Sequence, residues 1–440
     1  MVRSGTRGRQ KHKEDVDLLI LNANELVTVK GSSEKPAIGK QMRHLGIISG
    51  GSLAIKNGTI VAIGKTSEVK KEFKAEGVIS ASGKTVIPGL VDPHTHLVFS
   101  GSREDEFQMR IEGASYMEIL KAGGGILKTI KKTREASLER LVESGFKTLD
   151  VMLKHGTTTV EVKSGYGLTV EDELKILQAI RRLNQLHSVD VIPSFMGAHA
   201  VPPEYKNKSD KYVDLIIEKM IPQIAEKGLA QFCDVFCEKG VFDLAESRRV
   251  LHAAKEYKLR PKIHADEMSR LCGAELAAEI GAVSAEHLLF SSEDGLMAMA
   301  EQGVIAVLLP AAAFSLMTGQ YADARKMINL GVPVALGTDF NPSCWVENQQ
   351  LIIAFACHFM RLTAAEAMAA ATINAAHAID KADEIGSLEL GKKADAVIMD
   401  VPNHKFLGYR FGINIVEKVV KDGRLVFDRD EQSARNPLFF

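Results

Sequence analysis

Short apolar segments alternate with amphipathic helical patterns through the middle of this 440-residue chain, from about residue 87 to 385. Residues 157–162 form one apolar segment and precede a helical pattern over 171–186; residues 189–195 form the next and precede a helical pattern over 212–227. Repeated units of this kind predict an α/β fold, a (β/α)₈ barrel of the TIM type. In such a barrel the functional side chains stand at the C-terminal ends of the strands.

The two ends of the chain have a different sequence pattern, typical of β structure. From residue 16 to 86, short β segments are broken by Gly and Asn, and Asn57 and Gly58 lie between apolar runs as in a hairpin. Residues 386–440 show the same pattern of short β segments. Because chain termini often lie close together, we expect the two ends to form one small composite β-sandwich domain beside a barrel of residues 87–385. We expect residues 1–15 to be a flexible basic tail.

The composition limits the binding partners and the cellular compartment that we expect. The formal net charge is −1, which gives no electrostatic reason to expect nucleic acid or a membrane as a partner. The longest apolar stretch, 304–317, is shorter than the roughly 20 residues that span a bilayer. The five cysteines have no paired spacing of a disulfide framework or a zinc cluster, so we expect a protein of the reducing cytoplasm.

Four metal-ligand side chains stand where apolar segments end. His94 and His96 are two positions apart after an apolar run, so in a strand both imidazoles lie on one face. His264 and Asp339 close two later apolar segments. For any one of the four, a structural role is the commoner explanation, but together at strand ends they predict a site for one divalent metal. Zinc is the first expectation, and iron or manganese accept the same ligand types.

Two further groups are candidates for proton transfer. Glu267 follows His264 by three residues, near enough to face the same cleft without being a ligand. A carboxylate there can take a proton from activated water and return it to a leaving nitrogen. His287, at another segment end, could polarise a substrate oxygen. The alternatives are an acid favoured by a helix N-terminus for Glu267 and a core histidine for His287.

Longer motifs carry a resemblance to a known family. Residues 88–96 and 386–395 resemble the amidohydrolase superfamily, which implies a metal-dependent barrel with a composite β-sandwich. The finer motifs that resemble the imidazolonepropionase family within it are residues 100–107, 121–126, 161–168, 196–199 and 339–342. Together these motifs extend over nearly all of the chain after the basic tail.

The resemblance implies a reaction in histidine degradation, the hydrolysis of 4-imidazolone-5-propanoate to N-formimidoyl-L-glutamate. A metal-bound hydroxide would attack the ring amide carbonyl, with Glu267 as proton shuttle and His287 assisting. The substrate-binding residues that the resemblance implies are Arg103, Tyr116, Tyr166, His199, Glu267, Asn341, Ser343 and Cys344. The family commonly has Gly-Ser where this chain has Ser343 and Cys344. A homodimer is also expected.

Two other functions remain open. A nucleobase aminohydrolase of the same superfamily would share the metal site and Glu267, so Arg103, Tyr166 and His199 are the residues that discriminate against it. A catalytically silent relative that acts as an interaction scaffold would be expected to have a broken ligand set, whereas the set here is intact.

Overall fold

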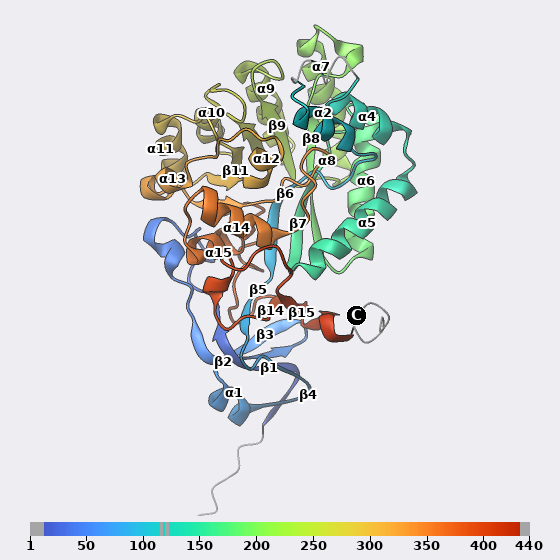
Figure 1. The fold of residues 1–440 in the computed structure, drawn as a ribbon. Helices are drawn as coiled ribbons and strands as arrows, with labels where there is room; N and C mark the ends of the chain where they lie inside the picture. Colours follow the sequence, from blue (N-terminus) through green and yellow to red (C-terminus); the bar gives the residue numbers. More distant parts are fainter. Residues whose placement is uncertain (1–12, 115–117, 119–122, 432–440) are drawn as a thin grey trace, which may run out of the picture.

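Two eight-stranded sheets organise the molecule (Figure 1). The structure is a computed structural model that describes residues 13–114, 118 and 123–431. The first sheet is parallel, and its neighbouring strands are consecutive in the chain. Its strands are β6 (Leu90–Thr95), β7 (Thr157–Lys163), β8 (Asp190–Ala198), β9 (Phe232–Cys237), β10 (Arg260–Ala265), β11 (Ser284–His287), β12 (Ile305–Leu308) and β13 (Val334–Leu336). The predicted parallel barrel is confirmed.

The first and last strands meet only at their C-terminal ends. There the N–H of Asp339 donates to the carbonyl of His94 at 3.1 Å, and the N–H of His96 donates to the carbonyl of Phe340 at 2.9 Å. Thr95 and Phe340 form a parallel bridge at the same place. The barrel is therefore closed by the backbone of residues that also carry the predicted metal ligands.

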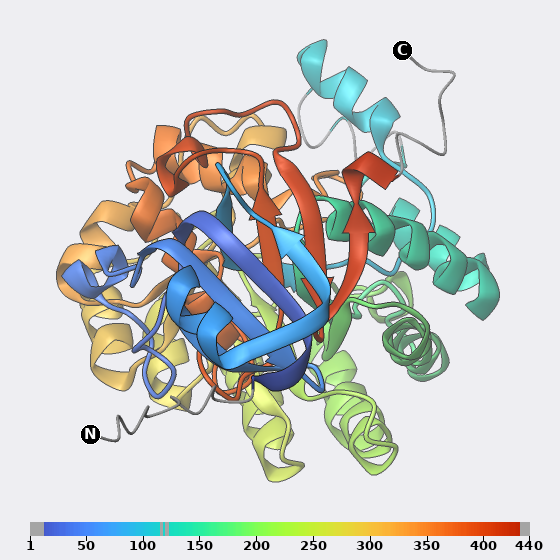
Figure 2. The same cartoon turned by 90° about the horizontal axis from the view of Figure 1, so that it is seen from below.

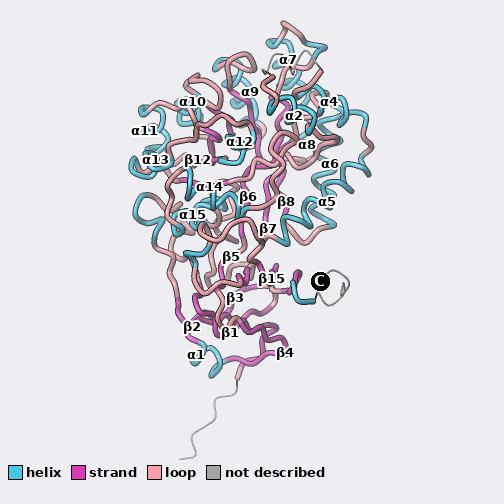
Figure 3. Tube along the Cα trace, viewed as in Figure 1, coloured by secondary structure: helices cyan, strands magenta, loops and turns pink. Residues whose placement is uncertain are grey.

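Helices surround the parallel strands (Figures 1 and 3). They are α2 (Glu104–Ile111), α4 (Ile126–Glu135), α5 (Leu138–Lys154), α6 (Val170–Leu186), α9 (Leu244–Glu256), α10 (Gly273–Ile280), α11 (Glu293–Gln302), α12 (Pro310–Ser315), α13 (Ala324–Leu330), α14 (Gln349–Phe359), α15 (Ala364–Ala370) and α16 (Ile373–His377). Several begin at a side-chain cap; Ser137 and Thr169, for example, accept the N–H three residues on. In the described part of the chain, no helix has both the length and the apolar character that crossing a bilayer requires.

The helix expected over 212–227 is divided into three parts. It comprises α7 (Ser209–Leu215), a π-helical turn η3 (Ile216–Met220) and α8 (Ile221–Glu226). Pro222 has no N–H to donate to the carbonyl four residues earlier. A widened turn beside a proline relieves that missing bond and the steric conflict of the ring.

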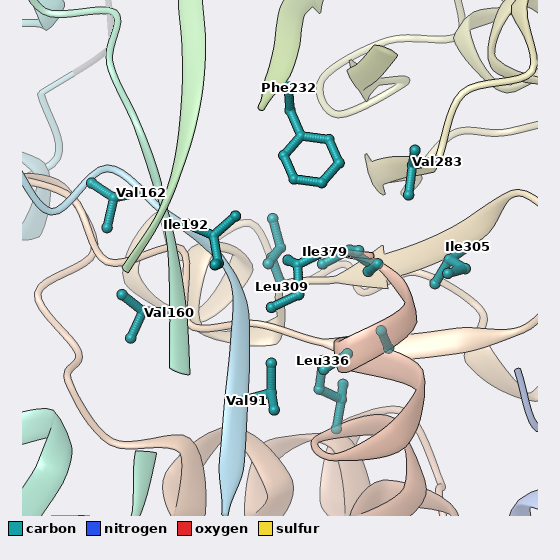
Figure 4. Close-up of a cluster of buried hydrophobic side chains, with 14 of the residues drawn as sticks. Val91, Val160, Val162, Ile192, Phe232, Val283, Ile305, Leu309, Leu336 and Ile379 are labelled. Carbon is teal, nitrogen blue, oxygen red and sulfur yellow. The ribbon is translucent and has the colours of Figure 1, made fainter. Parts of the chain in front are cut away.

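Alternate residues of the strands face different surroundings. Val160 and Val162 on β7 belong to the large apolar core that packs under the helices, and Figure 4 shows them with other members of this core. Their neighbours Glu161 and Lys163 are fully buried and contact Lys262 on β10 and Asp234 on β9, respectively. Since side chains alternate along a strand, the inside of the barrel is ionic while its outer face is aliphatic.

The second sheet joins the two ends of the chain. Its order is β16-β15-β14-β5-β1-β2-β3, with β4 paired to β1. The bounds are β1 (Glu14–Leu26), β2 (Ile48–Lys56), β3 (Thr59–Lys65), β4 (Phe73–Ser80), β5 (Thr85–Pro88), β14 (Ala396–Met399), β15 (Val416–Lys421) and β16 (Arg424–Asp428), with α1 (Thr66–Glu72) beside them. Figure 2 shows the N-terminal and C-terminal strands side by side beneath the barrel. Asn57 and Gly58, both with positive φ, turn the predicted β2–β3 hairpin.

The two ends of the chain share an apolar cluster on one face of this sheet. Leu18 and Leu53 from the N-terminal strands pack with Ile398 and Val420 from the C-terminal strands. The composite β domain expected from the two chain ends is therefore confirmed as part of the fold.

The chain passes from β5 to the barrel strand β6 at Gly89. An added Cβ there would lie 2.1 Å from the hydroxyl oxygen of Thr158 on β7, so the close approach of the chain to β7 requires glycine.

Candidate active site

Three imidazoles and one carboxylate converge at the C-terminal rim of the barrel. Ligand atoms of His94, His96 and His264 all lie within 4.8 Å of one another. Oδ1 of Asp339 is 3.4 Å from Nε2 of His94 and 3.8 Å from Nε2 of His96. His94 belongs to β6 and His96 follows its last residue, His264 belongs to β10, and Asp339 lies in the turn after β13, all at strand ends as predicted. All four are buried.

The hydrogen-bonding state of these imidazoles fits a cation. Nδ1 and Nε2 of His94 and Nδ1 of His96 are buried and have no hydrogen-bond partner among the described residues. Nε2 of His96 faces Nε2 of His264 at 3.4 Å. Two nitrogens that each lie about 2.05 Å from one tetrahedral zinc ion are about 3.3 Å apart, so this spacing matches ligands of one ion. Burial lowers the pKa of His94 and of His96, which leaves both imidazoles neutral and able to bind a metal.

The backbone is strained at this rim. Asp339 has φ 51° and His287 has φ 70°, in the left-handed region that residues with a Cβ rarely adopt. Strain of this kind gathers at functional sites, where the surrounding structure maintains it. Asp92 supplies part of that support, because its carboxylate accepts the N–H of Thr338 at 3.1 Å and the hydroxyl of Thr338 at 2.6 Å.

Glu267 and His287 face each other beside the metal-ligand cluster. Nε2 of His287 is 3.7 Å from Oε2 of Glu267. Burial, together with the nearby charge of Asp339, raises the pKa of Glu267 to about 8, and burial lowers the pKa of His287 well below its ordinary value. A carboxyl group with a pKa near neutrality is suited to taking up and returning a proton.

Two buried carboxylates fix the loop that carries Glu267. Asp266 accepts the N–H of Leu271 at 2.9 Å and that of Gly273 at 3.0 Å. Glu238, just after β9, accepts the N–H of Met268 at 2.9 Å. Glu267 therefore projects from a loop that is anchored on both sides.

An ionic network fills the barrel beneath the cluster. Nζ of Lys163 is 2.8 Å from Glu161 and 2.7 Å from Asp234, and Nζ of Lys262 lies 3.6 Å from Glu286. All of these side chains are fully buried. Asp234, His264 and Glu286 also form a second group with metal-ligand geometry. Lys163 already pairs with Asp234, and Lys262 pairs with Glu286. We therefore infer that this second group supports the upper cluster and does not itself hold an ion.

A cavity of about 250 Å³ opens above the cluster. Among the residues implied to bind substrate, those that line it are Arg103, Tyr166, His199, Glu267, Asn341, Ser343 and Cys344. His96, His264, His287 and Asp339 line its floor. Tyr116, the remaining expectation, lies outside the described residues. The structure thus brings three of the four predicted metal ligands, both proton-transfer groups and every described substrate-binding candidate to one cavity, with His94 beside its floor.

Tyr166 and His199 form one wall of the cavity with His96, one of the predicted metal ligands. The imidazole of His199 stacks on that of His96 with ring centroids 4.8 Å apart, and Tyr166 lies 5.3 Å from His199. Nδ1 of His199 is 3.0 Å from the carbonyl of Gly165. Gly165 has φ +110°, and a Cβ there would lie 2.9 Å from Nδ1 of His199, so glycine is required for this approach.

The turn after Asp339 is held by its own side chains. Oδ1 of Asn341 accepts the N–H of Ser343 at 2.8 Å and that of Cys344 at 3.2 Å, and its Nδ2 donates to the carbonyl of Asp339 at 2.8 Å. The two backbone N–H groups are thus engaged within the turn. The hydroxyl of Ser343 instead accepts from Nη1 of Arg103 at 2.7 Å.

Sequence reasoning did not identify Asp234, Glu238 or Asp266 as members of the site. Asp234 lies between apolar residues of a buried strand, and a charge in such a position is a signal that could have found it. Glu106 on α2 also lines the cavity. It follows Arg103 by three residues, a spacing that puts both side chains on one face of a helix.

Known proteins are similar to this chain in sequence and in fold. The sequence profile of the amidohydrolase family matches residues 85–426. The imidazolonepropionase of Alkaliphilus metalliredigens is 54% identical over 94% of this chain and 99% of its own length, and that of Geobacillus kaustophilus is 55% identical over 93% and 97%.

Solved structures of lower identity share the fold. A zinc-bound adenosine deaminase from Xanthomonas campestris has a TM-score of 0.72 at 20% identity, with 96% of this chain and 98% of that chain covered. Guanine deaminase of E. coli has a TM-score of 0.71 at 17% identity, with 93% and 99% covered. Family profile and near full-length relatives agree: the chain belongs to the amidohydrolase family, among its imidazolonepropionases.

Proposed function

We propose that this protein hydrolyses 4-imidazolone-5-propanoate to N-formimidoyl-L-glutamate in histidine degradation. The observation that carries the proposal is the identity of 54–55% to imidazolonepropionases over nearly the whole chain. The cavity supports it, because a metal-type cluster, an acid–base pair and the cation of Arg103 face one space. A cyclic amide with a carboxylate tail needs all three.

One divalent ion is proposed for the cluster of His94, His96, His264 and Asp339, with zinc as the expected metal and iron as the alternative. When bound there, a divalent ion activates water for attack and polarises the amide carbonyl. Glu267 takes the proton of the attacking water and delivers it to the ring nitrogen as the carbon–nitrogen bond breaks. His287, neutral through burial, hydrogen-bonds the reacting oxygen.

The substrate residues have defined hydrogen-bonding roles. Burial, with the nearby charge of His264, lowers the pKa of His199 to about 3, so this imidazole is neutral. A carbonyl only accepts hydrogen bonds, so Nδ1 of His199 carries the proton and Nε2 is left as an acceptor for a ring N–H of the substrate. Burial raises the pKa of Tyr166, which keeps its hydroxyl as a donor. Arg103 offers its planar fork to the propionate carboxylate.

The decisive experiment supplies 4-imidazolone-5-propanoate to the metal-loaded protein. N-formimidoyl-L-glutamate is expected to appear with the wild-type chain and to be strongly reduced with Glu267→Gln at equal metal content. A wild-type protein that gives no such product but releases ammonia from a nucleobase would establish the nucleobase aminohydrolase instead.

The proposal also includes the cellular compartment and the oligomeric state of the protein. All five cysteines are free, which suits an enzyme of the reducing cytoplasm. The resemblance also implies a homodimer, which sedimentation equilibrium would test.

A further inference from the structure

Helices α2 and α4 are joined at two points beside the cavity. Nε of Arg103, at the N-terminal cap of α2, donates to Oγ1 of Thr129 on α4 at 3.0 Å. The N–H of Gly125, at the cap of α4, donates to Oε1 of Glu106 on α2 at 2.9 Å. The contacts are three residues apart on α2 and four apart on α4. Each contact joins the cap residue of one helix to a side chain of the other, so the two helices are tied together at both positions.

The guanidinium of Arg103 is thereby held from two directions. Thr129 accepts from Nε, and Ser343, on the turn after β13, accepts from Nη1 at 2.7 Å. A guanidinium has five N–H donors, so these two bonds set its plane and leave other donors for a ligand. Thr129 is buried and is absent from the described residues that line the cavity.

We propose that Thr129 is a positioning residue that acts through Arg103: its hydroxyl fixes the guanidinium plane so that the terminal nitrogens meet the carboxylate of the substrate. This inference rests on the proposed function. Without the hydroxyl, a long side chain with several rotatable bonds must be ordered each time the anion binds. The consequence falls on substrate binding, because Thr129 touches none of the groups that transfer the proton.

The test is a double-mutant cycle in the full-length, metal-loaded protein. Thr129→Val removes the hydroxyl at nearly constant volume and is expected to raise the KM for 4-imidazolone-5-propanoate about five- to tenfold, with kcat within about twofold. Thr129→Ser restores the hydroxyl and is expected to restore KM. In an Arg103→Ala background, Thr129→Val is expected to change KM less than about twofold, since the group through which it acts is gone.

A matched control separates this role from simple packing. Thr133, one turn further along α4, is also buried, and its hydroxyl accepts the N–H of Ser100 at 3.1 Å. Thr133→Val is expected to lower the melting temperature about as much as Thr129→Val but to leave KM unchanged. An equal rise of KM in the presence and absence of Arg103, or no rise at all, overturns the role of Thr129. A wild-type chain without turnover of this compound rejects the proposed function together with this inference.

Discussion

Nδ1 of His264 lies 3.1 Å from Oδ1 of Asp234, whose other oxygen is 2.7 Å from the ammonium of Lys163. Burial alone would lower the pKa of His264, but the charge and hydrogen bond of Asp234 outweigh it and raise that pKa. The carboxylate therefore fixes the proton on Nδ1 and leaves the lone pair of Nε2 facing His96. A carboxylate that accepts the remaining N–H of a metal-binding histidine both orients the ring and raises its basicity.

Replacing Asp234 should weaken the metal site. In Asp234→Asn the amide can present its N–H to Nδ1 and favour the wrong tautomer, so we expect metal affinity to fall about 10- to 100-fold. Competition with a chelator of known affinity measures this directly. Asp243→Asn is the matched control, because Asp243 caps α9 by accepting the N–H of Glu246, and Asn is an equally good cap. Equal metal affinity in Asp234→Asn and wild type would contradict the role of Asp234.

Glu267→Gln should separate chemistry from metal binding. The amide cannot take up a proton, so turnover should fall about 10²- to 10⁴-fold while metal content stays at the wild-type value. Metal analysis beside steady-state kinetics measures both. Turnover close to wild type would remove Glu267 as the proton shuttle, and loss of metal would show that its role is to hold the ion.

Much of the fold follows from local patterns. The alternation of apolar and amphipathic segments predicts the barrel, and Asn57-Gly58 predicts the hairpin, because periodicity and turn chemistry act over a few residues. The closure of the barrel through Asp339 and Phe340 could not be predicted. It depends on backbone bonds between residues almost 250 positions apart.

The sequence predicted which residues make up the site, but not the hydrogen bonds and ion pairs that hold them in place. His94, His96, His264 and Asp339 stand out because each is polar at the end of an apolar segment. By contrast, the turn in which Asn341 holds the N–H groups of Ser343 and Cys344 is a matter of side-chain conformation. Lys163 shows the same limit, since its partner Asp234 belongs to β9, two strands away in the sheet, and reaches it only in the folded barrel.

Arg103→Ala should affect substrate affinity and spare the metal. Its guanidinium lies on the cavity wall, bound to Thr129 and Ser343, and none of the metal ligands contacts it through a hydrogen bond among the described residues. Loss of a charge-assisted contact to the carboxylate should raise KM about 10- to 100-fold. Arg103→Lys is the control that keeps the charge without the fork, and it should restore only part of the affinity. An unchanged KM in Arg103→Ala would remove this residue from the site.

Glu366 should make the stability of the molecule depend on pH. This buried carboxylate on α15 accepts from Arg325 at 2.6 and 2.9 Å and from Arg43, on the segment after β1, at 3.0 Å. Burial acts to raise the pKa, but the hydrogen bonds from Arg325, Thr363 and Arg43 outweigh it and hold the pKa of Glu366 at about 2 instead of 4.5. The folded state therefore favours the ionised form. Its contribution is fully present above the unfolded pKa and is lost as pH falls through 4.5 toward 2.

Glu366→Gln should accordingly lose about 2 kcal/mol of stability at neutral pH, with the difference from wild type shrinking as the pH falls below about 4. Gln cannot ionise, so as the pH falls toward and below the folded pKa both chains come to present a neutral group to Arg43 and Arg325. Melting temperatures of the two proteins across this range measure the effect, with exposed Glu226→Gln as the control for loss of one surface charge. A deficit that stays constant from neutral pH to about 3 would mean that the substitution acts through packing and not through the ionised carboxylate.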